Sequence, residues 1–376
     1  MFKLPYVLAF TAMTAFFWGI YGIVLHRGTV LMDHNSLRAF VGVGLAYFLI
    51  AVLVPVALLN RKRETGYWSM SGTIMSLFAG AVGALGALGV TLALAFNGQA
   101  IYVMPIVFGG APVVNTLLTS WLNKSFKQIK PMFLVGMLMV ALGMIGVLLA
   151  KPQPKVDDVE VAVNWLAVGL SIAMAVICWG AYGPFLHIGQ SKMGGSRLRP
   201  FCCVGIAYFF IAVAIPVVLL ESMQNSGQYT FWGMIWSVLA GTAGALGALG
   251  IILAFTYGGK PIFVMPLVFG FAPVINTLTS IVVTGKYESV NALFAGALAL
   301  GIAGAVTVLL NAPKAKPHGA PGDANATAAA AVDKKKDISA TLRELDPATR
   351  SSHPGMRSDH SVEQTTAISE DETPHP

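Results

Sequence analysis

Two apolar stretches of this chain each carry an asparagine followed by a threonine, Asn115 and Thr116 in one and Asn276 and Thr277 in the other. Amide and hydroxyl groups both donate and accept hydrogen bonds, so these pairs could bind a polar substrate inside an apolar protein. The alternative is hydrogen bonding between packed membrane helices, worth about 0.6 kcal/mol on average. Either use requires that the pairs lie on helices within a bundle.

The two stretches are copies of one another. Residues 101–117 read IYVMPIVFGGAPVVNTL and residues 262–278 read IFVMPLVFGFAPVINTL, so 13 of 17 positions are identical at an offset of 161 (262 − 101). Proline removes a backbone donor and kinks a helix. We therefore predict two bent transmembrane helices that act in gating. The predicted kink residues are Pro105, Gly109, Pro112, Pro266, Gly270 and Pro273.

Aromatic and glycine-rich motifs recur at the same offset. Trp18 and Tyr21 share one face of the first predicted span, and Trp179 and Tyr182 share the equivalent face of the sixth. We expect these rings to form a wall of the substrate site, which would suit a sugar or an apolar metabolite. The alternative is an aromatic belt at the membrane interface. The sequence GALGALG at 83–89 and 244–250 predicts close contact between helices.

Charged residues lie outside the apolar spans. The seven acidic residues of 1–310 are all in loops or at span ends, so no buried carboxylate is available for a proton relay. Lys260 begins the ninth span where the first copy has Gln99, and it could attract a carboxylate or phosphate as part of the substrate site. Arg38 and Arg199 open the second and seventh spans, where they could bind an anion or reach lipid headgroups.

The composition is that of a membrane protein: 56% of residues are hydrophobic and 11% are charged, against about 25% charged in soluble proteins. A span needs about 20 apolar residues, and ten stretches qualify. The repeat holds without a gap through five of them. We therefore predict an all-α membrane protein of two five-helix repeats, 1–150 and 164–310, joined by a loop at 151–163. Residues 311–376 are predicted to be a disordered cytoplasmic tail.

Because five is odd, the second repeat must be inverted in the membrane relative to the first. With the N-terminus inside, the cytoplasmic segments hold 13 Lys and Arg and the outer loops hold five. The positive-inside rule therefore predicts cytoplasmic termini. We expect an integral protein of the plasma (inner) membrane.

The motifs resemble the drug/metabolite transporter superfamily over about residues 5–310. The resemblance is carried by WGIYG at 18–22, by RAFVGVGLAYF at 38–48 and by the Pro- and Gly-rich fourth and ninth spans. They are most similar to the EamA-like and glucose/ribose-porter branches. The resemblance implies that helices 1, 3, 4, 6, 8 and 9 enclose a central cavity.

The predicted function is a secondary transporter that moves a small polar metabolite, such as a sugar or amino acid, by alternating access. The alternative is a non-transporting membrane scaffold or sensor that acts through the C-terminal tail. No catalytic dyad, metal cluster or nucleotide motif occurs in the spans, so we expect neither an enzyme nor a cofactor. The expected partners are the small-molecule substrate and the lipid bilayer, without nucleic acid. Uptake and export are both left open.

Overall fold

A computed structural model describes residues 3–61, 64–96, 100–124, 126–150, 163–222, 227–284 and 292–311, and all regular secondary structure in these ranges is helical. Most of the predicted connecting loop (151–162) and nearly all of the predicted tail (312–376) lie outside the described residues. The side chains of Pro105 and Thr277 also lie outside them.

The chain forms a series of helices with short connections. The α-helices are α1 (Leu4–Val30), α2 (Ser36–Tyr47), α3 (Val54–Asn60), α4 (Met70–Ala95), α5 (Ala100–Leu122), α6 (Pro131–Leu149), α7 (Trp165–Lys192), α8 (Leu198–Phe209), α9 (Ile215–Ser222), α10 (Phe231–Thr256), α11 (Pro261–Thr284) and α12 (Ala292–Asn311). A 3₁₀ turn, η2 (Phe126–Gln128), precedes α6.

Equivalent residues begin equivalent helices. The Ser69 hydroxyl accepts a hydrogen bond from the Gly72 N–H at the start of α4, and the Thr230 hydroxyl accepts one from the Gly233 N–H at the start of α10, both at 3.1 Å. A side-chain acceptor at this position satisfies one of the free N–H groups of a helix N-terminus. Each hydroxyl lies 161 positions from the other, so the repeat extends to helix capping.

Two π-helical segments also stand at equivalent places. They are η1 (Phe48–Leu53), which joins α2 to α3, and η3 (Phe210–Ala214), which joins α8 to α9. Pro55 and Pro216 lie two residues after the ends of these segments. Proline cannot donate to the preceding turn and its ring displaces the carbonyl there, so a locally wider turn upstream is the expected response.

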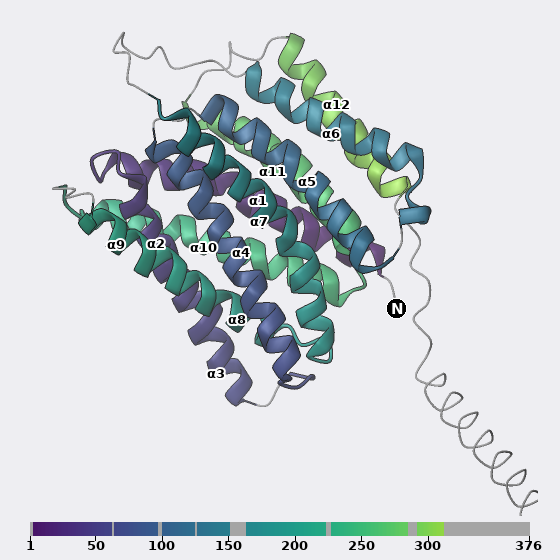
Figure 1. Cartoon of the computed structure of the whole chain (residues 1–376), viewed down its shortest axis with the longest axis horizontal. Coiled ribbons are helices and arrows are strands. Elements are labelled where there is room, and N and C mark those ends of the chain that lie inside the picture. The colour runs from purple at the N-terminus through teal and green to yellow at the C-terminus, as the bar shows by residue number, and fades with distance from the viewer. Residues whose placement is uncertain are drawn as a thin grey trace, which may run out of the picture. The chain divides into compact units, whose positions relative to one another are not determined.

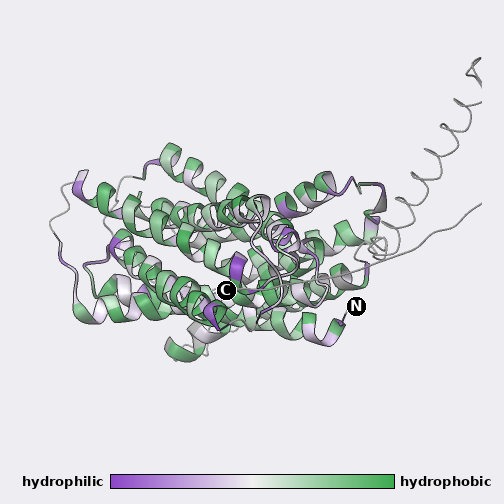
Figure 2. Cartoon of the chain, turned by 90° about the horizontal axis from the view of Figure 1, so that it is seen from below, coloured by the Kyte–Doolittle hydropathy of each residue, from purple (hydrophilic) through white to green (hydrophobic). Residues whose placement is uncertain are grey.

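In the described part of the chain, six helical segments are long and apolar enough to cross a membrane. They are Leu4–Val30, Ser36–Asn60, Met70–Ala95, Trp165–Lys192, Leu198–Ser222 and Phe231–Thr256. Shorter apolar stretches of 10–17 residues are described in α5, α6, α11 and α12. Figure 2 shows hydrophobic residues along most of the helices and hydrophilic residues mainly at their connections. These features indicate an integral membrane protein.

Helix packing pairs elements of the two halves (Figure 1). Helix α1 packs on α10 and α11, whereas its counterpart α7 packs on α4 and α5. In the same way α2 packs on α10, and α8 packs on α4. Helices α6 and α12 pack on each other, with Gly143 against the backbone of Gly301. Equivalent helices therefore exchange partners between the halves.

Candidate functional site

Aromatic rings from four helices meet in the interior of the bundle. Phe269 of α11 lies between the two predicted tryptophans, with its ring centroid 6.3 Å from Trp18 and 6.3 Å from Trp179. Phe108 of α5 lies 6.1 Å from Trp179 and 6.2 Å from Phe269, and Tyr182 lies 6.2 Å from Trp18. We call these five residues the aromatic centre. It brings together three of the four aromatic residues predicted for the site.

The glycine-rich motifs hold the two tryptophans. Trp18 Nε1 donates to the Gly244 carbonyl of α10 and Trp179 Nε1 donates to the Gly83 carbonyl of α4, each at 3.1 Å. The indole rings lie where a side chain on Gly247 or Gly86 would be. The prediction of close helix contact at GALGALG is confirmed. Both half-buried indole rings are therefore held between helices.

A pair of tyrosines lies next to the aromatic centre. Tyr47 and Tyr208 stack with ring centroids 3.8 Å apart and ring planes 3° apart. The edges of the Tyr182 and Tyr208 rings both lie within about van der Waals distance of Gly83. The fourth predicted aromatic residue, Tyr21, is only half-buried. Sequence reasoning missed Tyr47, Tyr208, Phe108 and Phe269, although each lies in a repeated motif (AYF or VFG).

The two asparagines make different contacts. Asn115 Nδ2 donates to the Pro261 carbonyl of α11 at 2.9 Å, and Asn276 Nδ2 donates to the Gly19 carbonyl of α1 at 3.0 Å. Both amides therefore join helices, as expected if the asparagines form hydrogen bonds between packed membrane helices. Asn115 is fully buried, and its Oδ1 atom has no hydrogen-bond partner among the described residues. This oxygen lies beside Gly183 of α7, and it can accept a hydrogen bond from a bound molecule.

Other predicted residues of α5 and α11 face α6 instead. The Thr116 hydroxyl lies 3.1 Å from the Met137 sulfur of α6. Gly109 faces Ala141 and Gly270 faces Val140, which are also in α6. Pro112, Pro266 and Pro273 are buried, and both helices continue through them. Gly109, Gly270 and Thr116 thus line the contact with α6, whereas Asn115 lies beside Gly183 of α7.

The basic residues lie at the ends of the helices. Arg199 pairs with Glu64 at 3.4 Å and Arg38 lies 3.8 Å from Asp33, so each predicted anion ligand already has a carboxylate nearby. Lys260 directly precedes Pro261, whose carbonyl accepts from Asn115. Burial lowers the pKa of the Lys260 ammonium below its ordinary value. Of the predicted site residues, Lys260 is the one that carries a charge.

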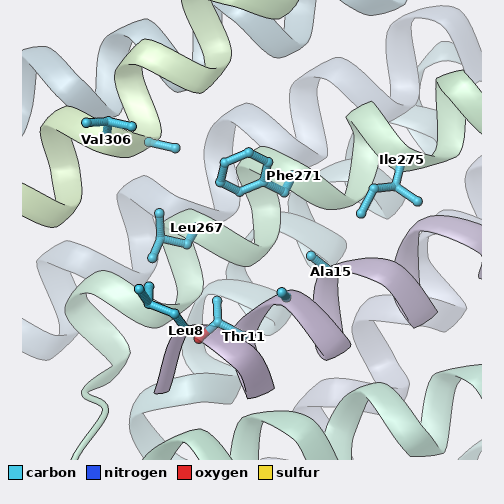
Figure 3. A pocket seen from close by; sticks show the side chains of 9 residues that line it. Leu8, Thr11, Ala15, Leu267, Phe271, Ile275 and Val306 are labelled. Carbon is cyan, nitrogen blue, oxygen red and sulfur yellow. The ribbon is translucent and has the colours of Figure 1, made fainter. Parts of the chain in front are cut away.

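A cavity of about 350 Å³ lies elsewhere, between α1, α11 and α12 (Figure 3). Its lining residues are Leu8, Thr11, Ala12, Ala15, Leu267, Phe271, Ile275, Ala305 and Val306. The one hydroxyl among them, on Thr11, donates to the Val7 carbonyl of its own helix. The lining is therefore apolar, and it includes none of the residues predicted to bind substrate.

Comparison with known proteins identifies similarity of fold. The sequence matches no protein-family model and no curated protein. Among solved structures, 22 chains match. One of them, titled "Crystal structure of protein", superposes with a TM-score of 0.60 at 15% sequence identity, over 82% of this chain and 99% of that chain. At this identity the similarity shows a shared fold alone.

Proposed function

We propose that the protein is a secondary transporter that moves a small polar metabolite by alternating access, with ten spans in two inverted five-helix repeats. This is the architecture of the drug/metabolite transporter superfamily that the sequence resembles. The proposal places the substrate at the aromatic centre, between the two halves. It also places the protein in the plasma (inner) membrane with both termini in the cytoplasm.

The observation that carries the proposal is the exchange of contacts between the halves. Trp18 of the first half bonds to Gly244 of the second, and Trp179 of the second bonds to Gly83 of the first, at the same distance. Such reciprocity is expected where two copies of one unit face each other around a two-fold axis. In transporters built from repeats, substrate sites lie near that interface, and the repeats move against each other.

The chemistry of the aromatic centre supports a small polar substrate. Aromatic faces provide apolar contact area, and a few polar groups orient the ligand. Here those groups are the free Asn115 Oδ1 and the Tyr182 hydroxyl, which is also buried and has no partner among the described residues. Both can accept hydrogen bonds, and the tyrosine can also donate one.

Transport should be tested with the purified protein in proteoliposomes, using a panel of labelled sugars, amino acids and small anions. A Trp18→Leu/Trp179→Leu variant should lose accumulation of the transported compound. The control is Trp121→Leu, because Trp121 is 66% exposed on the outside of α5. Absence of transport across the panel by protein with the thermal stability of the native fold would count against the proposal.

Topology provides an independent test. A reporter fused after Leu310 should be cytoplasmic, and one inserted within 151–160 should be external. Both reporters on the same side of the membrane would overturn the inverted arrangement, whatever the substrate.

A further inference from the structure

The two halves do not pack identically, although their sequences repeat. Helix α7 packs on α10 and α11 in addition to α4 and α5. The equivalent contacts of α1 would be with α4 and α5, and among the described residues these helix pairs are not packed in this way. The C-terminal half of α7 is accordingly mostly buried, while the equivalent half of α1 is mostly half-buried or exposed.

One pair of equivalent residues shows the difference at atomic scale. A Cβ atom on Gly183 would lie 2.6 Å from Met265, so α7 and α11 are in direct contact there. The counterparts are Gly22 of α1 and Met104 of α5. Among the described residues, a Cβ atom on Gly22 would meet only Asn276 within 4 Å, so Met104 does not contact Gly22. Met265 is fully buried and Met104 is half-buried.

A hydrogen bond reinforces the contact at the α7 end. Gln190 Nε2 donates to the Ile252 carbonyl at 3.0 Å and lies 2.8 Å from the Thr256 hydroxyl, both in α10. The counterpart of Gln190 is Thr29, which donates to the Leu25 carbonyl of its own helix. The counterpart of Thr256 is Ala95, which has no polar side chain. The C-terminal end of α7 is therefore hydrogen-bonded to α10, whereas the equivalent end of α1 lacks the corresponding bond to α4.

The asparagines follow the same pattern. Asn115 crosses to the first residue of α11, Pro261, at the closed end. The counterpart of Pro261 in the first half is Ala100, the first residue of α5, so an equivalent bond would join Asn276 to Ala100. Asn276 instead bonds to Gly19. The two equivalent asparagines thus have non-equivalent hydrogen-bond partners within one structure.

We propose that this structure is one of two interchangeable states, closed where α7 meets α10 and α11 and open where α1 faces α4 and α5. In the other state the contacts exchange between the halves: Met104 packs on Gly22, Asn276 Nδ2 donates to the Ala100 carbonyl, and Met265 leaves Gly183. Because the Gly–Met and Asn contacts use identical residues at both ends, the states can be close in free energy. The inference rests on the proposed function, whose topology makes the closed end cytoplasmic.

The test uses single cysteines in a variant whose native cysteines, Cys178, Cys202 and Cys203, are changed to alanine. In detergent-solubilised protein, where both ends of the bundle are accessible, Met104→Cys should react with a water-soluble thiol reagent, and Met265→Cys should not. Locking the open end should reverse this order, with rate changes of at least about tenfold. The lock is a short bifunctional thiol reagent applied to Thr29→Cys/Ala95→Cys. A reagent is used because the gap that the long Gln190 side chain spans at the equivalent position is wider than a direct disulfide can bridge.

A matched lock at the closed end, Gln190→Cys/Thr256→Cys, should leave the labelling order unchanged. Thr29→Cys/Thr256→Cys is the unlinked control, since its two sites lie at opposite ends. Equal labelling of both methionine positions, or failure of the open-end pair to link, would overturn the inference. Labelling needs no substrate. If it reverses as expected while no compound is transported, the two states stand and the proposed transport function fails.

Discussion

Tyr47 stacks on Tyr208 with ring centroids 3.8 Å apart, and the two residues are separated by the repeat offset of 161 (208 − 47). A residue can stack face to face on its own copy only where an axis relating the two copies passes between them. Direct face-to-face stacking is not the arrangement that isolated rings prefer. Close packing of α2 on η3 and of α8 on η1 imposes it, since Gly44 contacts Ala212 and Gly205 contacts the equivalent Ala51.

Substitution of the glycines that hold the tryptophans should destabilise the fold. Alanine normally stabilises a helix over glycine by about 0.5–1 kcal/mol. In Gly86→Ala and Gly247→Ala the new methyl group would overlap an indole ring, so we expect a net loss of about 1–3 kcal/mol. Thermal unfolding in detergent measures the effect. Gly169→Ala and Gly296→Ala are controls, because no atom of the described residues lies within 4 Å of the added atom. Equal melting temperatures in all four variants would contradict close packing at Trp18 and Trp179.

The Glu64 carboxylate should stabilise the junction before α8. It is 5% exposed and accepts hydrogen bonds from the Ser196 hydroxyl at 2.8 Å, the Leu198 N–H at 2.9 Å and Arg199 Nη1 at 3.4 Å. Glu64→Gln leaves Arg199 without its counter-charge, at an expected cost of about 1–3 kcal/mol. The exposed Glu221→Gln is the control. A Glu64→Gln/Arg199→Gln variant should recover part of the loss, and no recovery would argue against the ion pair.

Replacement of Lys260 by its counterpart should change stability in a pH-dependent manner. Burial lowers the Lys260 pKa from 10.5 in the folded protein. Between the lowered pKa and 10.5 the unfolded chain binds more protons, so this residue makes stability rise as pH rises through that window. Lys260→Gln should therefore stabilise the protein slightly at neutral pH, by less than about 1 kcal/mol, and flatten the rise. Melting temperature against pH tests this, with the exposed Lys192→Gln as control. A destabilising Lys260→Gln at neutral pH would show that the charge has a partner.

Periodicity and repetition predicted the helices well. The predicted kinked stretch at 101–117 lies within α5, and its copy lies within α11. Close helix contact at the GALGALG motifs was also predicted, because small residues allow close approach. The packing of Trp18 and Trp179 against these motifs was not predicted. The repeat could not predict the unequal contacts of Asn115 and Asn276. Their sequence surroundings are nearly the same, so the difference arises from the state of the whole bundle. Phe269 was also missed, because a single phenylalanine in an apolar helix is indistinguishable from a core residue by pattern.

Substitution of each asparagine by leucine separates helix packing from substrate binding. Asn276→Leu removes one interhelical hydrogen bond and should lower stability by about 0.6 kcal/mol. Asn115→Leu removes a similar bond but also a buried oxygen without a partner, whose burial is itself unfavourable. We therefore expect the stability of Asn115→Leu to be unchanged or higher. Leucine has the same number of side-chain heavy atoms branched at the same position, so packing is largely kept.

Substrate affinity should respond in the opposite order. If Asn115 Oδ1 accepts a hydrogen bond from the substrate, its loss costs about 0.5–1.5 kcal/mol, or up to about tenfold in KM for transport. Asn276→Leu should affect KM less, because in this state its amide is already bonded to Gly19. Thermal stability and KM should be measured on the same preparations. A less stable Asn115→Leu with an unchanged KM would assign this residue to helix packing, and substrate recognition would then rest on the aromatic centre.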